Sequence, residues 1–287
     1  MPITWTYTQS TKTQTEPKIY GKEITINQNF LALDNPWVID SVTMSQIYTA
    51  MILGVMFAVY PNTLTDFIEH PETWDATSLA IDLLVPFIFA PFLAYRIYLI
   101  KKLSKIYFNR KTQSIYCRRG KKLFTLDWRT IHGGMLTMRV FYGNSWSVSY
   151  ALALASPRRD GSLHQRDCVW IDSNRPHDPA IRHVEEMWEY LRHFMEHGPD
   201  KLPPPGPPNW WHRPMHAISL TPAEAWRHYV PWRTGEPGEM QGKKNWQLPF
   251  WAIVFPLTFP VSVCWYIICK VFNVKAAPVP PEAFALK

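Results

Sequence analysis

Apolar residues gather in three stretches of this chain, and polar residues fill the long interval between the second and the third. The stretches cover residues 43–60, 79–100 and 248–272. A bilayer core about 30 Å thick needs ~20 apolar residues in a helix that rises ~1.5 Å per residue. The second and third stretches reach that length, and the first nearly does if its polar start lies at the interface. The pattern therefore predicts an integral membrane protein with about three transmembrane helices.

The alternative is that these stretches are core helices of a soluble protein. Residues 83–95 (LLVPFIFAPFLAY) carry no charge and no polar face, whereas a helix packed on a soluble core usually keeps a charged stripe. The third stretch leaves a second choice open. Pro249, Pro256 and Pro260 would bend it, because each proline frees a backbone carbonyl. It would then either cross the membrane or dip in and return.

The charge pattern predicts an orientation in the membrane. Residues 61–77 contain acidic side chains and no Lys or Arg, whereas four basic residues follow closely on one another from Arg96 to Lys105. Basic residues stay on the cytoplasmic side during insertion. We expect a cytoplasmic N-terminal segment (1–41), a transmembrane hairpin with a short acidic outer loop (42–100), a cytoplasmic domain (101–200), a proline-rich linker with a short helix (201–247), a third transmembrane segment (248–272) and an outer tail (273–287).

The polar interval has the period of β-strands. Short strands are predicted at residues 106–108, 114–117, 123–128, 135–142, 147–154 and 168–171. Residues 179–197 then predict an amphipathic helix, with Trp188 and Leu191 on its apolar face and Glu189 and Arg192 on its polar face. Six strands followed by one helix is the element order of a pleckstrin-homology-like barrel, in which the helix closes one end of the curved sheet. The expected fold class is an α+β membrane protein that carries such a cytoplasmic domain.

Two shorter features lie within these regions. Thr221, Pro222 and Glu224 have the spacing of a capping box, which predicts a short helix inside the linker. Gly133 and Gly134 are adjacent, and we interpret the pair as a bend between strands.

Positive charge is the strongest chemical signal. Residues 101–244 contain 23 Lys and Arg against 13 Asp and Glu. Nine of these basic residues lie within residues 101–122, which hold no acidic one. Each Lys or Arg near anionic lipid gains roughly 1 kcal/mol. The candidate lipid- or partner-contact residues are therefore Lys101, Lys102, Lys105, Arg110, Lys111, Arg118, Arg119, Lys121 and Lys122.

Other interpretations of the nine residues are that they only enforce topology and solvate two hairpin turns, or that they bind nucleic acid. The aromatic residues between them alternate like those of a sheet core, which argues against nucleic acid. We therefore expect no nucleic-acid partner.

Motifs for catalysis, cofactors and metals are absent from the sequence. It contains no Gly-rich phosphate loop, no Gly-x-Ser-x-Gly and no His-Glu-x-x-His. His193 and His197 are four residues apart, but no further ligand stands at zinc-site spacing. The four cysteines do not form a disulfide framework. We expect neither an enzyme nor a bound cofactor or metal.

Several short runs stand out in the polar interval, namely Tyr107-Phe108-Asn109-Arg110, Leu126-Asp127-Trp128, Trp188 with Leu191-Arg192, Phe194-Met195-Glu196 and Gly198-Pro199. These runs resemble an uncharacterised bacterial domain family. Members of that family occur in Gram-negative genomes, often beside genes for type VI secretion effectors, and carry two apolar spans before a strand-rich domain. The resemblance covers about residues 35–205 and brings no catalytic residue with it.

The resemblance implies a non-enzymatic protein of the bacterial inner membrane that binds a protein partner. Its cytoplasmic domain would act as an immunity or accessory protein for a type VI secretion effector. Two alternatives stay open, namely a regulatory membrane protein that binds anionic lipid and an enzyme that modifies lipids or the envelope. The enzyme would need a cluster of acid, base or nucleophile that the sequence does not display.

Overall fold

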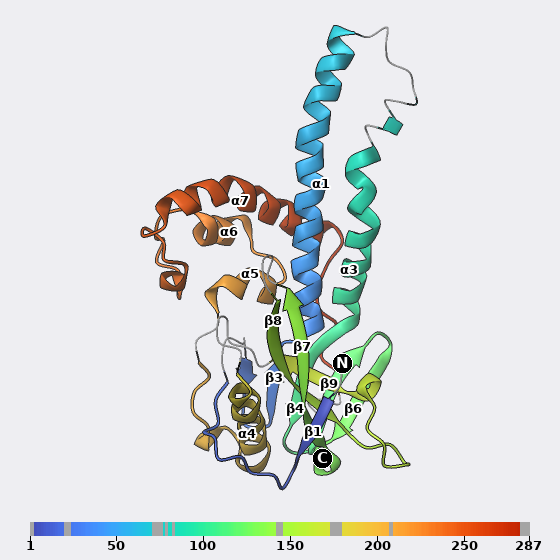
Figure 1. Ribbon diagram of the computed structural model, residues 1–287, viewed down its shortest axis with the longest axis vertical. Helices are drawn as coiled ribbons and strands as arrows, with labels where there is room; N and C mark the ends of the chain where they lie inside the picture. The colour runs from blue at the N-terminus through green and yellow to red at the C-terminus, as the bar shows by residue number, and fades with distance from the viewer. Residues whose placement is uncertain are drawn as a thin grey trace. The chain divides into compact units, whose positions relative to one another are not determined.

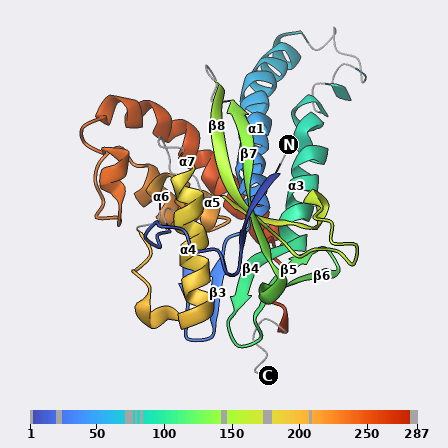
Figure 2. The same ribbon diagram turned by 60° about the horizontal axis from the view of Figure 1, so that its bottom comes forward.

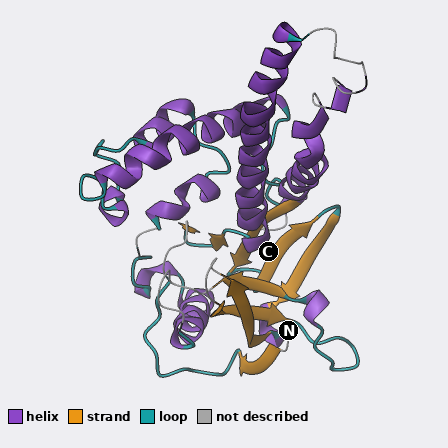
Figure 3. Ribbon diagram, turned by 45° about the horizontal axis from the view of Figure 1, so that its top comes forward, coloured by secondary structure: helices purple, strands orange, loops and turns teal. Residues whose placement is uncertain are grey.

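The chain of 287 residues folds into two compact units in a computed structural model (Figure 1). The structure describes residues 3–19, 24–70, 77, 80–81, 84–141, 146–172, 180–206 and 209–281. The first unit contains Met1–Val38, Lys102–Asn209 and Ala276–Lys287, and the second contains Ile39–Lys101 and Trp210–Lys275. The described strands belong to the first unit, whereas the second is helical (Figure 3).

One sheet of the first unit has four antiparallel strands in the order β1-β7-β8-β9. The long pair is β7 with β8, in register from His132 opposite Ala155 to Phe141 opposite Trp146. The edge strand β1 brings the N-terminus onto β7, with Ile3 opposite Leu136. The bounds are Ile3–Thr8 (β1), His132–Phe141 (β7), Trp146–Ala155 (β8) and Val169–Asp172 (β9).

The other sheet has five antiparallel strands in the order β2-β3-β4-β5-β6. The six strands predicted from the alternation are present as β4 to β9. The pattern predicts no strand before residue 106, yet β1, β2 and β3 place the N-terminal segment within both sheets. The bounds are Ile24–Ile26 (β2), Phe30–Leu33 (β3), Leu103–Asn109 (β4), Ser114–Arg119 (β5) and Lys122–Asp127 (β6).

Both sheets share one hydrophobic core with helix α4, Arg182–His197 (Figure 2). Trp188 of α4 stacks between Trp128 and Tyr7, with ring centroids 5.5 Å apart in both pairs. The predicted amphipathic helix is confirmed, although its predicted start at Pro179 lies outside the described residues. The unit is therefore α+β with two sheets, and the pleckstrin-homology-like barrel stays a prediction. Three single 3₁₀ turns complete it: η3 (Trp128–Thr130), η4 (Gln165–Asp167) and η5 (Pro199–Lys201).

Gly133 and Gly134 lie inside β7, so the interpretation of this pair as a bend is wrong. A Cβ atom on Gly133 would lie 2.8 Å from the Trp188 ring in the core. A Cβ atom on Gly134 would lie 2.8 Å from the ring of Trp5. Successive residues of a strand face opposite sides of the sheet. Each glycine therefore leaves space for an aromatic ring on its own side.

The polar face of α4 is buried as well as its apolar face. Glu186, Glu189 and Arg192 are all buried. The N-terminal segment passes over this face, and the Thr13 N–H donates to Glu189 Oε1 at 2.5 Å. The Arg192 guanidinium donates to Glu189 Oε2 at 2.6 Å, so these buried charges are paired.

The helices of the second unit are linked to the first by α1 and α3. The predicted capping box is confirmed at the start of α6, where Thr221 Oγ1 accepts from the Glu224 N–H and Glu224 Oε2 accepts from the Thr221 N–H. The bounds are Pro36–Glu69 (α1), Val85–Phe89 (η2), Ala90–Lys102 (α3), Trp210–His212 (η6), Arg213–His216 (α5), Pro222–Tyr229 (α6), Glu239–Gly242 (η7) and Leu248–Val271 (α7).

Two helices in the described part of the chain, α1 and α7, are long and apolar enough to cross a membrane. Residues 41–65 of α1 carry no charge. The hydroxyl groups of Thr43, Ser45 and Thr49 donate to carbonyl oxygens four residues earlier, at 2.8–2.9 Å. These polar side chains are thus satisfied within the helix and need no water.

The second predicted span is not one continuous helix in the described residues. Pro86 stands in the first turn of the 3₁₀ helix η2, and Pro91 is the second residue of α3, which has 13 residues. Proline lacks an N–H and interrupts the hydrogen bonding of a helix. In the described residues, two helices therefore fit a membrane span by length and composition, and the third span stays a prediction.

The helix α1 extends beyond its predicted end. It continues through Pro61 to Glu69, so the first half of the predicted outer loop is helical, while residues 71–76 lie outside the described chain. α3 runs alongside α1 (Figure 1), where Arg96 pairs with Asp40 at 2.7 Å and the rings of Tyr48 and Phe92 lie 5.8 Å apart.

We predict that Gly133→Ala destabilises the first unit by about 1–3 kcal/mol, because the new methyl group overlaps the Trp188 ring. The measurement is thermal unfolding of the purified chain in detergent, followed by near-ultraviolet circular dichroism. Gly54→Ala is the matched control, since an added Cβ atom there meets nothing within 4 Å. Equal unfolding temperatures for Gly133→Ala and the unsubstituted chain would contradict the packing described here.

Candidate functional site

Two short junctions connect the paired strands β3 and β4 to the long helices. β3 leads into α1 through Asp34 and Asn35 alone, and α3 leads into β4 with no residue between them. The Asn35 amide donates to the Ser104 carbonyl at 3.1 Å, and its oxygen accepts from the Trp37 N–H at 3.1 Å at the start of α1. Asp34 is buried and pairs with Lys105 at 2.8 Å. These contacts fix the start of α1 against the start of β4.

Five of the nine candidate basic residues lie at this end of the five-stranded sheet. The hairpins fold so that Leu103 pairs with Arg119 and Arg119 pairs with Lys122. The Gly120 N–H, in a turn with φ of 67°, donates to the Lys102 carbonyl at 2.8 Å. We call this group the basic end; its members are Lys102, Arg118, Arg119, Lys121 and Lys122.

The side chains of the basic end differ in their solvent exposure and in their contacts within the protein. Lys121 and Lys122 are exposed at the turn. The Arg119 guanidinium donates to the Cys168 carbonyl and lies 4.7 Å from the centre of the Phe124 ring. Lys101 immediately precedes this group in the chain, and its Nζ donates to the Phe272 carbonyl at 3.1 Å. The two exposed lysines are therefore the strongest candidates for contact with an external anion.

The other three candidate residues lie elsewhere on the sheet. Lys105 pairs with Asp34 inside the junction. Arg110 lies at the far end of β4, donates to the Glu196 carbonyl at 3.4 Å and packs against Gly198. Lys111 is exposed in the adjacent turn. A strand rises ~3.3 Å per residue, so the seven residues of β4 separate these two ends by about 20 Å. The nine residues thus do not form one continuous site.

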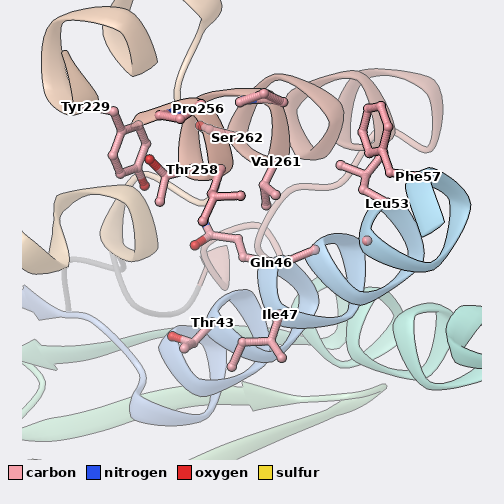
Figure 4. A pocket seen from close by; sticks show the side chains of 14 residues that line it. Thr43, Gln46, Ile47, Leu53, Phe57, Tyr229, Pro256, Thr258, Val261 and Ser262 are labelled. Atoms are coloured by element: carbon pink, nitrogen blue, oxygen red, sulfur yellow. The ribbon is translucent and has the colours of Figure 1, made fainter. Parts of the chain in front are cut away.

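An apolar groove of about 520 Å³ lies between α1 and α7 in the second unit (Figure 4). Ile47 and Phe57 of α1 line one side, and Leu257 and Val261 of α7 line the other. Tyr229 of α6 closes one end (Figure 4), and burial raises the pKa of its hydroxyl to about 12. A groove with these walls can take an apolar chain, and a neutral phenol is the group that it presents at this end.

Three polar side chains along the groove already donate hydrogen bonds to backbone carbonyl groups. The Thr43 and Thr258 hydroxyl groups donate to backbone carbonyls of their own helices at 2.9 Å. The Gln46 amide donates to the Pro214 carbonyl at 3.4 Å. The groove therefore offers little recognition of a charged ligand.

A buried network of charged and aromatic side chains holds residues 210–247 in place. The Glu236 carboxylate accepts from the Trp210 indole at 2.6 Å, lies 3.0 Å from His228 Nδ1 and pairs with Arg213. The rings of Trp210 and His228 pack with centroids 4.2 Å apart. Trp251 of α7 is joined to the same region, because its indole donates to the Gly242 carbonyl at 3.0 Å.

Lys244 is a second buried charge in this network. It is fully buried, and its Nζ donates to the Arg227 carbonyl at 2.6 Å and lies 5.4 Å from the centre of the Trp210 ring. Glu239 is 4.0 Å away and accepts from the Thr234 N–H at 3.0 Å. The charges partner one another and the backbone, which indicates a structural role for the network.

The described residues contain no group of three or more His, Cys, Asp or Glu side chains that could hold a metal ion. The rings of His193 and His197 lie 4.8 Å apart on α4. Cys117 and Cys168 are free thiols, and burial raises the pKa of both. A thiol with a raised pKa is a poor nucleophile at neutral pH.

The sequence gives only indirect signals for the groove and the Glu236 network. Seven of the 14 tryptophans lie between residues 210 and 265, which marks this region as densely packed. His228 and Glu236 stand eight residues apart and have no motif spacing. Their contact depends on a turn that residue types alone do not specify.

A family described as a family of unknown function (DUF6708) matches residues 77–279. The match covers more than half of the chain, and the chain belongs to this family. An uncharacterised domain family is thus confirmed, but its range differs from the resemblance, since it includes the third apolar stretch and the segment before it. No curated protein and no solved structure matches the chain.

Acidification is expected to loosen residues 210–247. Burial lowers the pKa of His228 below its ordinary value. Burial alone would raise the pKa of Glu236, but hydrogen bonds from His228 and Trp210 and the charge of Arg213 outweigh it, so that this pKa is lowered. A group whose folded pKa lies below its unfolded pKa stabilises the fold above the unfolded value and loses that effect as the pH falls. The loss begins below pH ~6.5 for the histidine and below ~4.3 for the carboxyl group.

Hydrogen exchange of the detergent-solubilised chain, corrected for the intrinsic pH dependence of exchange, measures this loosening. Peptides from residues 225–245 should exchange faster as the pH falls below ~6.5, and His228→Gln should remove that first step. His164→Gln is the control, because His164 is exposed and lies in the other unit. Unchanged exchange of these peptides across the histidine range would refute the prediction.

Proposed function

We propose that this chain is a membrane-anchored, non-enzymatic binding protein whose sheet unit works at the surface of a bacterial inner membrane. The observation that carries the proposal is the position of the basic end, which lies where α3 passes into β4 without a loop. A chain that leaves the bilayer at Lys102 would bring Lys121 and Lys122 to the lipid headgroups. The cytoplasmic side follows from the charge pattern of the sequence.

Anionic headgroups are the ligand that this chemistry favours. Each Lys or Arg near an anionic bilayer contributes roughly 1 kcal/mol, so the basic end can contribute a few kcal/mol in total. The attraction decays over a Debye length of about 8 Å at physiological salt. Only residues held close to the membrane benefit, and the two exposed lysines of the β5–β6 turn meet that condition in this arrangement.

A protein partner is a second candidate, favoured by the outer face of the four-stranded sheet. This face is apolar although it lies on the side of the sheet opposite to the core. Trp5 and Trp170 are half-buried on it, and tryptophan is over-represented among residues that dominate binding energies. We call it the outer face; Leu136, Ala151 and Ala153 are buried beneath the half-buried Ile3, Trp5 and Trp170, and the Trp170 ring packs edge-on against Trp37 at 5.4 Å.

The resemblance described above suggests the kind of partner. A type VI secretion effector, or a component that carries it, would bind the outer face while the helices keep the complex at the membrane. The chain would then act as an immunity or accessory protein.

The lipid contact is tested by hydrogen exchange of the full chain in nanodiscs. Phosphatidylglycerol added to phosphatidylcholine should slow exchange in residues 118–123, and high salt should reverse the effect. Lys121→Gln with Lys122→Gln should abolish it. The matched control is Lys111→Gln with Arg129→Gln, which removes the same charge from exposed residues at the far end of the sheet. Equal exchange in neutral and anionic nanodiscs would remove the lipid proposal.

The protein partner is tested by co-purification in mild detergent from cells that retain the native locus. The unsubstituted chain should recover a specific partner, and Trp5→Ala with Trp170→Ala should lose most of it. Near-ultraviolet circular dichroism at the temperature of the experiment checks that the double variant is still folded. Trp232→Ala is the control, because it removes an exposed tryptophan from the other unit. Recovery of no specific partner, or undiminished recovery by the double variant, counts against this candidate.

A further inference from the structure

The C-terminal end of α7 is tied to the C-terminal end of α3. Lys101 Nζ donates to the carbonyl of Phe272, the residue that follows α7, at 3.1 Å. The chain then turns at Asn273, which has a φ of 47°. Five residues after Phe272, the Ala277 N–H donates to the carbonyl of Leu103 at 2.9 Å. Phe272 and Ala277 thus contact Lys101 and Leu103, the residues on either side of the junction between α3 and β4.

The tail continues onto the five-stranded sheet. Val279 packs against a cluster that contains Ala32, Tyr107 and Tyr116. Whichever side of a membrane holds the sheet therefore also holds residues 277–279. This arrangement contradicts the expected outer location of the tail, because an outer tail would be separated from the sheet by the bilayer.

The N-terminal end of α7 lies on that same side. The chain between Lys101 and Leu248 has no helix in its described part that is long and apolar enough to cross a bilayer. Its longest helix, α4, has 16 residues and is packed in the sheet core. The chain therefore does not change sides between the end of α3 and the start of α7.

We infer that α7 does not cross the bilayer but lies along one leaflet, on the side of the membrane that holds the sheets, with one face on residues 210–242 and the other in lipid. The inference rests on the proposed anchoring by α1. Both ends of the 24-residue helix are on one side, and a single continuous helix cannot return to its side of entry. Within the second unit, α7 runs across α1 rather than beside it (Figures 1 and 3).

One side of α7 packs on residues 210–242 through buried aromatic side chains that also form hydrogen bonds. Trp251 and Trp265 are buried, and their indoles donate to the Gly242 carbonyl at 3.0 Å and to the Ile218 carbonyl at 2.6 Å. Trp226 of α6 packs edge-on against Phe255 of α7 at 5.1 Å. The two carbonyl groups thus bind the indole N–H groups of α7, which in an interfacial helix would usually donate to water.

The opposite side of α7 is exposed and apolar. Ile253, Ile267 and Val271 are 69%, 52% and 71% exposed. Their spacing follows one helical face. A contiguous apolar surface of this kind is unfavourable in water and marks a contact with a membrane or a partner. Lipid is the occupant that the neighbouring apolar helix α1 favours.

Two further features suit the boundary between lipid and water. Pro256 and Pro260 lack the N–H groups that would bind the carbonyls of Ala252 and Pro256. Such carbonyls are costly in the hydrocarbon core and can bind water near the headgroups. Trp232 and Trp246 are 52% and 82% exposed in the segment before α7, and tryptophan is enriched at membrane interfaces.

The test uses four single-cysteine positions in the full chain, each exposed in the structure: Glu69→Cys, Lys121→Cys, Gln247→Cys and Lys275→Cys. The native cysteines are kept, and the unsubstituted chain measures their background. A membrane-impermeant maleimide is applied to intact spheroplasts and to inside-out vesicles. Lys121→Cys, Gln247→Cys and Lys275→Cys should label well above background from one side, and Glu69→Cys should label from the other.

Each alternative result overturns a distinct statement. If Lys275→Cys labels with Glu69→Cys and apart from Gln247→Cys, then α7 crosses the bilayer and the inference is wrong. If Glu69→Cys labels from the same side as Lys121→Cys, then α1 is not an anchor, and the placement of α7 falls with the proposed function. Labelling of Gln247→Cys apart from Lys121→Cys would place the start of α7 on the opposite side and also overturn the inference.

Discussion

The passage from paired strands into helices is the constraint on which the rest of this structure depends. Neighbouring strands lie ~4.8 Å apart, whereas packed helices need 8–10 Å between their axes. β3 and β4 therefore cannot both continue straight into α1 and α3. Asp34 and Asn35 form a two-residue connection between β3 and α1, which lets the chain shift sideways there; α3 and β4 have no such connection. Both residues are buried and need polar partners, because an unpaired buried polar group costs about 1–3 kcal/mol. Lys105 and the Ser104 carbonyl are those partners.

The direct connection of α3 to β4 also explains why the basic end lies at this end of the five-stranded sheet. α3 continues into β4, and the tight turn at Gly120 returns the chain to the same end of the sheet. The lysines of that turn are thus brought to the end of α3 by strand pairing. The sequence shows nine neighbouring basic residues, but a strand places the two ends of such a run far apart. Only pairing registers, which depend on distant contacts, separate Arg110 and Lys111 from the rest.

The fold was predictable from the sequence where the pattern is local and strong. Strands β4 to β9 alternate clearly, α4 has a long apolar face and Thr221 forms a recognisable cap. The N-terminal strands were missed because β1 pairs with β7 across more than a hundred residues, as Ile3 opposite Leu136 shows. The same segment buries the polar face of α4, which looks solvent-exposed in isolation. The interpretation of Gly133 as a bend was wrong because the Trp188 ring, which is distant in the chain, leaves no space for a Cβ atom at this position.

The two long apolar helices show what composition can and cannot predict. Length and hydropathy identify α1 and α7 equally, and neither property distinguishes a helix that crosses from one that lies flat. The distinction comes from what is attached at the ends and along one side. In α1, the hydroxyl groups of Ser45 and Thr49 donate to carbonyl oxygens of the same helix, so these two side chains need no further partner. α7 instead directs the indoles of Trp251 and Trp265 to backbone carbonyls of residues 210–242. A helix that depends on a polar, charged segment along its length stays beside that segment, and residues such as Glu236 and Lys244 cannot follow it into hydrocarbon without a large desolvation cost.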